Sequence, residues 1–279
     1  MTTAKDIHVA PISQKDAATL VKRVHYSGKI VNNSQLHFGV FLNGKLEGVM
    51  SFGASLDKRK TQGLVSGTAW NDFLELNRMA FSEALPRNSE SRALSIAFKL
   101  IKKHYPNIEW IISFADGTQC GDGTIYRASG FVLTGIKKNT QIWQAESGET
   151  FSRMSLTDVS SKEEQQGSAK NIVNRVSVTK GIKILENGGA SMKNYAEAGF
   201  KPLKGFQLRY VYFLNPKAKE RLTVPILPFS KIDEMGASMY KGISIKRGTK
   251  ATSSDQLESG GAIPTATLQS LGEPHGSHT

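Results

Sequence analysis

The sequence has few cysteines and no long apolar run. Cys120 is the single cysteine among 279 residues, so no internal disulfide can form and we expect a reducing compartment. No apolar run is long enough to cross a bilayer, and the start of the chain, Met1 to Ile7, is too polar for a secretory signal. We therefore expect a soluble protein of the cytoplasm.

Acidic residues are also scarce. The chain has 24 Asp and Glu against 36 Lys and Arg, giving a net charge of +12 and a pI near 9.7. This balance favours a polyanionic partner, with nucleic acid as the default, although it carries no information about the fold. The length is enough for one large or two small domains with a proper core.

The clearest secondary-structure pattern runs from Leu74 to Gly135 and alternates strands with helices. Residues 74–81 alternate as a strand does, and apolar residues at helical spacing follow from Leu94 to Tyr105, where Pro106 ends the helix. Asn88 or Ser89 is expected to cap this helix by accepting from its first backbone N–H groups. A buried strand at residues 110–115 then ends on Asp116, and a short helix through Tyr126 closes on Gly130.

The flanking segments extend this pattern. Ser13 to Asp16 has capping-box spacing and opens a helix that reaches Val24. Asn43-Gly44 predicts a hairpin between strands at 37–42 and 45–52, and 56–69 is predicted to be a mobile basic loop. A last strand is expected at 206–214. These elements predict an α+β fold in which helices flank a mixed, largely antiparallel sheet.

We expect a catalytic domain at residues 1–215 with an insert at about 137–194, a basic extension at 216–250 and a disordered tail at 251–279. Near the end of the insert, Tyr195 to Pro202 repeats the pattern of Tyr126 to Phe131. The repetition indicates either a duplicated helix and strand or a chance recurrence, and one short match favours the second.

Four short motifs occur in an order that resembles the Mom family of bacteriophages, a branch of the GNAT acyltransferase fold. They are Leu76-Asn77-Arg78, Pro86 to Ser91, Ser113 to Asp116, and Tyr126 to Phe131. Members of that family convert adenine in phage DNA to an N6-carbamoylmethyl form that resists restriction. The resemblance implies a transferase with two partners, double-stranded DNA and a small-molecule donor, in the cytoplasm of the bacterial host.

Asp116 is the first candidate for catalysis. It follows a buried strand, where the first polar side chain emerges at the edge of the sheet. The amino group of adenine is a weak nucleophile, so a carboxylate that accepts or orients its protons suits the reaction. The alternative is that Asp116 only caps the glycine-rich turn that follows.

The resemblance adds five further residues. Ser91 and Arg78 would hold the donor group, Tyr126 and Tyr26 would contact the base or the donor, and His25 would assist. Each has a structural alternative: Ser91 as a helix cap, Arg78 in a salt bridge with Glu75 or Glu90, Tyr126 in the core and His25 as a lone structural histidine. No metal spacing is evident, and Cys120 lacks a neighbouring histidine, so we expect no structural zinc and an incidental thiol.

The loop before the second helix is the candidate donor site, through Arg87, Asn88, Ser89 and Arg92. GNAT enzymes use a glycine-rich loop here for the pyrophosphate of coenzyme A, whereas residues 86–92 contain no glycine. The usual mode of coenzyme A binding is therefore disfavoured, and the cofactor is left open.

Two basic groups are candidates for contacting DNA phosphates, with a solvated basic surface as the alternative. They are Lys58, Arg59 and Lys60 in the loop, and Lys241, Lys246 and Arg247 in the extension. Two other functions are consistent with the sequence: a GNAT acyltransferase that uses acetyl-coenzyme A on a non-DNA amine, and an inactive DNA-binding protein on a GNAT-like scaffold.

Overall fold

A computed structural model describes residues 2–25, 28, 30–118, 120–153, 156, 191–240 and 243–245. The tail expected at 251–279 and most of the insert lie outside these residues. The helices are α1 (Gln14–Val24), α2 (Lys58–Gln62), α3 (Ser89–His104), α4 (Thr124–Ala128), α7 (Met192–Glu197) and α8 (Ser230–Glu234), with 3-10 helices η1 (Ala4–Asp6) and η2 (Pro216–Arg221). The strands are β1 (His8–Pro11), β2 (Ser34–Leu42), β3 (Lys45–Gly53), β4 (Phe73–Phe81), β5 (Trp110–Asp116), β6 (Val132–Lys138), β7 (Ile142–Gln144), β8 (Thr150–Ser152), β9 (Lys201–Pro202), β10 (Phe206–Phe213), β11 (Met239–Tyr240) and β12 (Ile243–Ser244).

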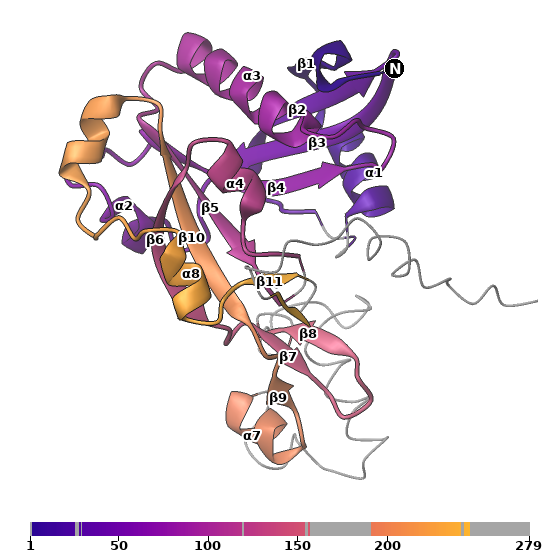
Figure 1. Ribbon diagram of the computed structural model, residues 1–279, viewed down its shortest axis with the longest axis vertical. Coiled ribbons are helices and arrows are strands. Elements are labelled where there is room, and N and C mark those ends of the chain that lie inside the picture. The colour runs from indigo at the N-terminus through magenta and orange to yellow at the C-terminus, as the bar shows by residue number, and fades with distance from the viewer. Residues whose placement is uncertain are drawn as a thin grey trace, which may run out of the picture. The chain divides into compact units, whose positions relative to one another are not determined.

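Within the described residues, the main sheet has seven strands in the order β1-β2-β3-β4-β5-β10-β6. Every neighbouring pair is antiparallel except β4 and β5, which are parallel because α3 crosses over between them. The late strand β10 enters between β5 and β6 (Figure 1). The predicted fold class, a mixed and largely antiparallel sheet with flanking helices, is confirmed.

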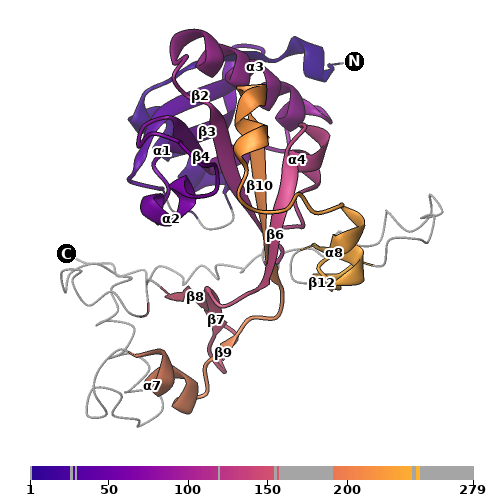
Figure 2. The ribbon, with the colours of Figure 1, turned by 90° about the vertical axis from the view of Figure 1, so that its left-hand side faces the viewer.

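Helices cover both faces of this sheet. Ala17, Leu20 and Val21 of α1 pack against Val49 and Ala80 on one face. On the opposite face, α3 buries its apolar side against the main core, as its helical spacing predicts. Figure 2 shows α1 and α2 on one side of the strands and α3 and α4 on the other.

Local sequence signals account for several boundaries. The Ser13 hydroxyl accepts from the Asp16 N–H at 3.1 Å and caps α1 as predicted. Asn43 and Gly44 both have positive φ, 51° and 77°, which is the geometry of the hairpin turn between β2 and β3. Helix α3 ends at His104, before Pro106.

Two local predictions are wrong. Asn88 occupies the N-cap position of α3 in the left-handed region (φ 70°), and its side chain makes no capping bond, while the Ser89 hydroxyl donates to the Pro86 carbonyl at 2.6 Å. The loop expected at 56–69 contains the short helix α2, which Asp57 caps through the Lys60 N–H. A cap of this kind stabilises one helical turn without any apolar periodicity.

The repeated pattern at Tyr126 and Tyr195 is a shared way of ending a helix. In both places a glycine has positive φ, 82° at Gly130 and 88° at Gly199. The following phenylalanine N–H bonds to the tyrosine carbonyl, and the two rings lie 5.2 Å apart. This is the bond and the apolar contact of a Schellman motif, and it explains the recurrence without requiring a duplication.

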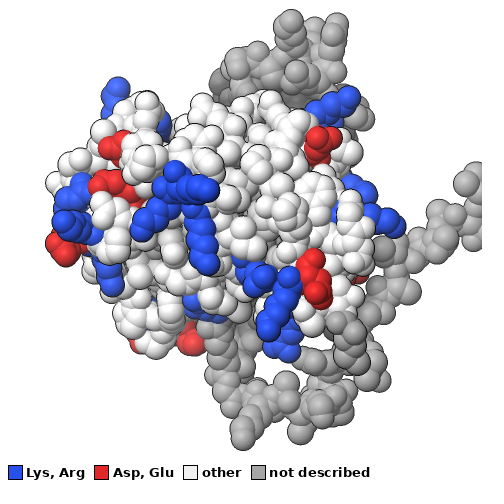
Figure 3. Space-filling view, turned by 90° about the horizontal axis from the view of Figure 1, so that it is seen from above, with Lys and Arg blue, Asp and Glu red and all other residues white. Residues whose placement is uncertain are grey.

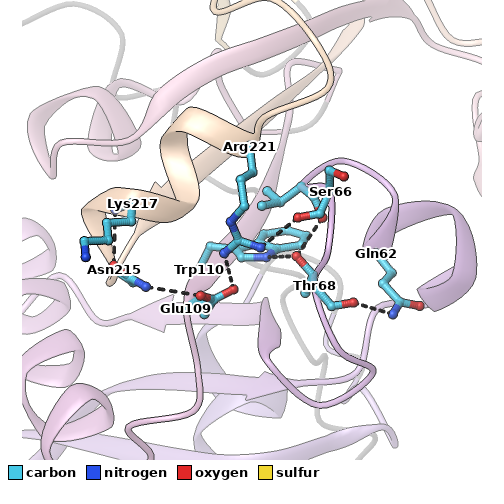
Figure 4. A network of polar contacts seen from close by, with 9 residues as sticks. Gln62, Ser66, Thr68, Glu109, Trp110, Asn215, Lys217 and Arg221 are labelled. Atoms are coloured by element: carbon cyan, nitrogen blue, oxygen red, sulfur yellow. Dashed lines mark hydrogen bonds and ion pairs between the residues drawn. The ribbon is translucent and has the colours of Figure 1, made fainter.

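The chain after β10 packs back onto the sheet. Arg221 of η2 contacts the Glu109 carboxylate at 2.5 Å and the Ser66 carbonyl at 2.7 Å (Figure 4). Asn215 donates to the other oxygen of Glu109 at 3.1 Å. These contacts join η2 to the loop after α2 and to the segment that enters β5, so the first part of the predicted basic extension is integral to the fold.

Candidate active site

Strands β4 and β5 separate after a short paired stretch, and this opening is the candidate site. Their pairing covers only Phe73–Glu75 with Trp110–Ile112, although both strands continue. A register shift on the other side of β4 places Asn77 in a bulge. The Ser113 hydroxyl donates to the Leu76 carbonyl at 3.4 Å where the backbone ladder has stopped. Side chains from both strands can therefore reach the opening.

Arg78 and His25 meet beside this opening, as the sequence predicts. Arg78 Nη1 lies 3.3 Å from His25 Nε2, which joins β4 to the end of α1. Burial, with a smaller effect from the Arg78 charge, lowers the pKa of His25 to about 4. The imidazole is therefore neutral at pH 7 and can accept a hydrogen bond from the guanidinium.

Tyr126 reaches the same region from α4. Its ring packs against Phe131 and Tyr210, as the core alternative predicts, while its hydroxyl hydrogen-bonds with Ser113. Burial raises the pKa of Tyr126, and the nearby charges of Glu75 and Arg78 also act on it. The polar side chains at the opening therefore form a cluster that spans it, with Arg78 and His25 on the α1 face of the sheet and Tyr126 on the α3 face.

Sequence reasoning missed three members of this cluster: Glu75, Asn77 and Ser113. Burial raises the pKa of Glu75 in spite of hydrogen bonds with Ser55 and Asn77 and the nearby Arg78 charge. The Asn77 amide donates to the Ala54 carbonyl at 3.1 Å and accepts from Ser34. Ser113 gave a usable signal, because it lies inside a strand predicted to be buried, where side chains are normally apolar. Glu75 lies at a polar position of a strand predicted to alternate and gave no such signal.

Asp116 makes the turn contacts that its structural alternative describes. Its carboxylate accepts from the Thr118 N–H at 3.0 Å and from the Thr118 hydroxyl at 2.5 Å. Burial still raises the pKa of Asp116. Along β5, Ile111 and Ala115 face the apolar core under α3, whereas Ile112 belongs to a separate apolar cluster on the other face of the sheet. Strand alternation therefore places Asp116 on the face opposite Ser113 and Tyr126.

Ser91 lies at the start of α3, apart from the polar cluster and from Asp116. With Asn88, Arg92 and Lys5 it borders a hollow of about 460 Å³, and its hydroxyl donates to the Asn88 carbonyl at 3.2 Å. Lys5, which the sequence did not single out, adds a second cation to that of Arg92. The hollow is therefore electropositive and suits an anionic group.

The remaining donor-loop residues differ. Arg87 is exposed, but Ser89 is fully buried and its hydroxyl bonds to Pro86, so the expected donor contact from the Ser89 side chain is wrong. The reason is that Ser89 is the first residue of α3 and faces the core rather than the hollow.

The candidate phosphate contacts lie on α2. Lys58 Nζ sits 4.6 Å from the centre of the Trp70 ring, which is 51% exposed, and it donates to Asn71 at 3.2 Å. Arg59 and Lys60 are exposed. On the face shown in Figure 3, Lys and Arg side chains are spread among acidic ones rather than gathered in one patch. Tyr26, Lys241, Lys246 and Arg247 lie outside the described residues.

In the part of the chain that the structure describes, no group of three or more His, Cys, Asp and Glu side chains is placed to hold a metal ion. None of the described helices is long and apolar enough to cross a membrane. Cys120 is exposed.

The low pKa of His25 predicts that the stability of the fold depends on pH. A pKa of about 4 in the folded protein, against an ordinary value of 6.5, stabilises the fold above pH 6.5, and this contribution is lost as the pH falls towards 4. Between these values we expect wild type to lose about 1 to 2 kcal/mol more free energy of unfolding than His25→Gln, after allowing for solvent screening. Urea titrations across this range measure it, with exposed His104→Gln as the control. If the free energies of unfolding of wild type and His25→Gln changed equally with pH, the prediction would be contradicted.

The chain is similar in sequence to one protein family and to one curated relative, and its similarity to solved structures is lower. A family model described as the Mom protein family matches residues 6–231. The curated methylcarbamoylase mom of Escherichia phage Mu is 33% identical over 224 residues, covering 80% of this chain and 82% of that protein. The solved ribosomal-protein-S18-alanine N-acetyltransferase of Escherichia coli aligns with a TM-score of 0.39 and 10% identity, over 75% of this chain and 94% of that one. An IAA acetyltransferase from Bacillus cereus gives a TM-score of 0.35 and 14% identity, over 52% and 93%.

Proposed function

Because the chain belongs to the Mom protein family, we propose that it transfers a carbamoylmethyl group to the N6 amine of adenine in duplex DNA. Such a modification would shield phage DNA from host restriction. The observation that carries the proposal at the level of the site is the polar cluster at the β4–β5 opening, which Arg78 and His25 reach from the α1 face and Tyr126 from the α3 face. A cluster of buried ionisable groups with perturbed pKa values is typical of a catalytic centre.

The reaction needs a proton acceptor near the adenine amine. A carbon–nitrogen bond forms between the carbamoylmethyl carbon and N6, the bond from that carbon to the donor breaks, and the leaving group keeps its electron pair. N6 must then lose a proton. The Asp116 carboxylate is the proposed acceptor, since its raised pKa makes it a better base than an ordinary aspartate.

Arg78 and Tyr126 are proposed to orient the transferred group. The His25 imidazole is neutral at pH 7, so it holds the guanidinium of Arg78 without adding a second positive charge. The Tyr126 hydroxyl is positioned beside Ser113, and a turn of its O–H bond away from Ser113 would let it donate to a developing negative charge on the donor. We propose that Tyr26 adds a contact to the base or the donor.

The hollow at the start of α3 is the proposed site for the rest of the donor. Ser91, Arg92 and Lys5 border it and favour an anionic donor, with Asn88 at its rim and exposed Arg87 nearby in the chain. The loop has no glycine, so side chains rather than bare backbone meet the donor. This loop distinguishes the chain from enzymes that cradle pyrophosphate on glycines.

Duplex DNA is the proposed substrate, held by α2 and by the basic segment after β10. Lys58, Arg59 and Lys60 would neutralise phosphates, and Lys241, Lys246 and Arg247 are proposed to do the same. The Trp70 ring beside Lys58 offers an exposed aromatic surface next to these charges. Phosphate contacts of this kind position the enzyme on DNA without reading its sequence.

Mass spectrometry of nucleosides tests the proposal. Expression of the gene in bacteria should yield plasmid DNA whose digest contains a deoxyadenosine heavier by one carbamoylmethyl group. An unchanged nucleoside spectrum from folded protein would overturn it. Saturable binding of acetyl-coenzyme A with acetylation of a non-DNA amine would then favour an ordinary acyltransferase, and salt-dependent DNA binding without product would favour an inactive binder.

A further inference from the structure

Phe114 is an exposed aromatic side chain in the interior of the main sheet. It lies on β5, which has β4 on one side and β10 on the other, yet 45% of its surface is exposed. An interior strand normally places an aromatic side chain under a helix or beside neighbours on both sides. The exposure of Phe114 therefore needs a cause in its surroundings.

The separation of β4 from β5 supplies that cause. Ile112, two residues earlier on the same face, pairs with Glu75 of β4, and this is the last pair between the two strands. Beyond it, Phe114 has its β10 neighbour Arg209 but no paired neighbour among the described residues of β4. One side of the ring therefore borders the opening.

The β10 side also leaves the ring uncovered. The Arg209 guanidinium turns to the bulge at Thr134, donating to its hydroxyl at 3.0 Å and to its carbonyl at 2.8 Å. The next residue in the row, Gly135, has no side chain. A cation is thus fixed beside Phe114 while the face of the ring stays accessible.

Two carboxylates flank Phe114 on the same face of the sheet. Glu75 lies beside Ile112, one pleat before the ring, and Asp116 follows one pleat after it. Burial raises the pKa of both carboxyls. An aromatic surface between carboxyl groups matches a base with an exocyclic amine, because the ring stacks on the base while a carboxylate accepts from the amine.

We propose that Phe114 is the surface on which the extruded adenine stacks, with its N6 amine directed to Asp116. This inference rests on the proposed function and identifies how the site would hold its substrate. It assigns base stacking to β5 rather than to Tyr126, whose ring is packed against Phe131 and Tyr210. It also gives a role to the placement of Asp116 on the face opposite Tyr126, since base and donor would enter the opening from different faces.

Direct binding tests the inference without requiring turnover. The probe is a duplex with one adenine opposite an abasic site, which is extruded at low cost, and its control has a second abasic site in place of that adenine. Phe114→Leu keeps an apolar side chain but removes the aromatic surface. We expect it to weaken binding of the adenine duplex about 10- to 100-fold and to leave binding of the control duplex unchanged.

Two further variants make the result specific. Phe114→Trp should bind within about threefold of wild type, because it restores an aromatic surface. Tyr105→Leu removes a ring of matched exposure, 46%, at the far end of α3 and should have no effect. Equal affinities of Phe114→Leu and wild type for the adenine duplex would overturn the inference.

The outcomes separate this inference from the proposed function. If wild type modifies adenine but Phe114→Leu binds the adenine duplex normally, the transferase stands and the stacking role fails. If Phe114→Leu loses the adenine preference while wild type yields no heavier nucleoside, the stacking role stands and the proposed transfer fails.

Discussion

Asp116→Asn should lower the rate of adenine modification at least about 100-fold. The substitution keeps an oxygen that can accept from the Thr118 N–H and hydroxyl, so the turn after β5 should persist. What it removes is the capacity to accept a proton from N6. Nucleoside mass spectrometry of DNA treated with purified protein, sampled over time, measures the initial rate.

The control for Asp116→Asn is Asp57→Asn, which alters the cap of α2 in the same chemical way. In urea titrations, the free energy of unfolding of both variants should equal that of wild type within about 0.5 kcal/mol. If Asp116→Asn modifies DNA at the wild-type rate, Asp116 is only a turn residue. Glu75, the other buried carboxylate beside Phe114, would then be the proton acceptor to test.

Asp122→Ala should destabilise the protein by about 3 kcal/mol or more. Asp122 is 3% exposed and lies 3.0 Å from Nη2 of Arg127, whose side chain is also largely buried. Its carboxylate also accepts from Ser238 at 3.2 Å, and its carbonyl accepts from the Tyr210 hydroxyl. Removal of the carboxylate would leave the Arg127 cation in a low-dielectric site. Equilibrium unfolding in urea measures the loss.

Two comparisons isolate the buried charge in this experiment. Glu234→Gln removes an exposed ion pair with Lys231 and should leave the free energy of unfolding close to that of wild type. Adding Arg127→Met to Asp122→Ala should recover part of the loss, because it removes the uncompensated cation. A double variant no more stable than Asp122→Ala alone would show that packing, and not charge, dominates at this position.

Local signals predicted most of the secondary structure. The cap at Ser13, the Asn43-Gly44 turn and the glycine at 130 act over a few residues, so sequence reading located α1, the β2–β3 hairpin and the end of α4. The same reasoning failed at Asn88, because a left-handed backbone there replaces the side-chain cap. It also missed α2, which one aspartate starts without an apolar face.

Only part of the site could be predicted from the sequence. Arg78, His25 and Tyr126 were expected to act together, and the structure places all three beside the opening, Arg78 and His25 on the α1 face of the sheet and Tyr126 on the α3 face. Glu75 and Ser113 join them only because β4 and β5 separate after residue 112. The sequence of neither strand predicts where the pairing between them ends. Ser91, expected to hold the donor group together with Arg78, instead borders a hollow at the start of α3.

The sequence by itself determined the order of elements, the positive charge and the family, because turn residues, strand and helix periodicity and short motifs are properties of neighbouring residues. Only the tertiary structure decided which side chains share a face. Strand pairing puts Glu75 of β4 beside Ile112 of β5, and the divergence of β4 beyond that pair leaves Phe114 open between Glu75 and Asp116. The neighbours of Phe114 are residues far apart in the chain, and the pairing of strands, which no single strand specifies, brings them together.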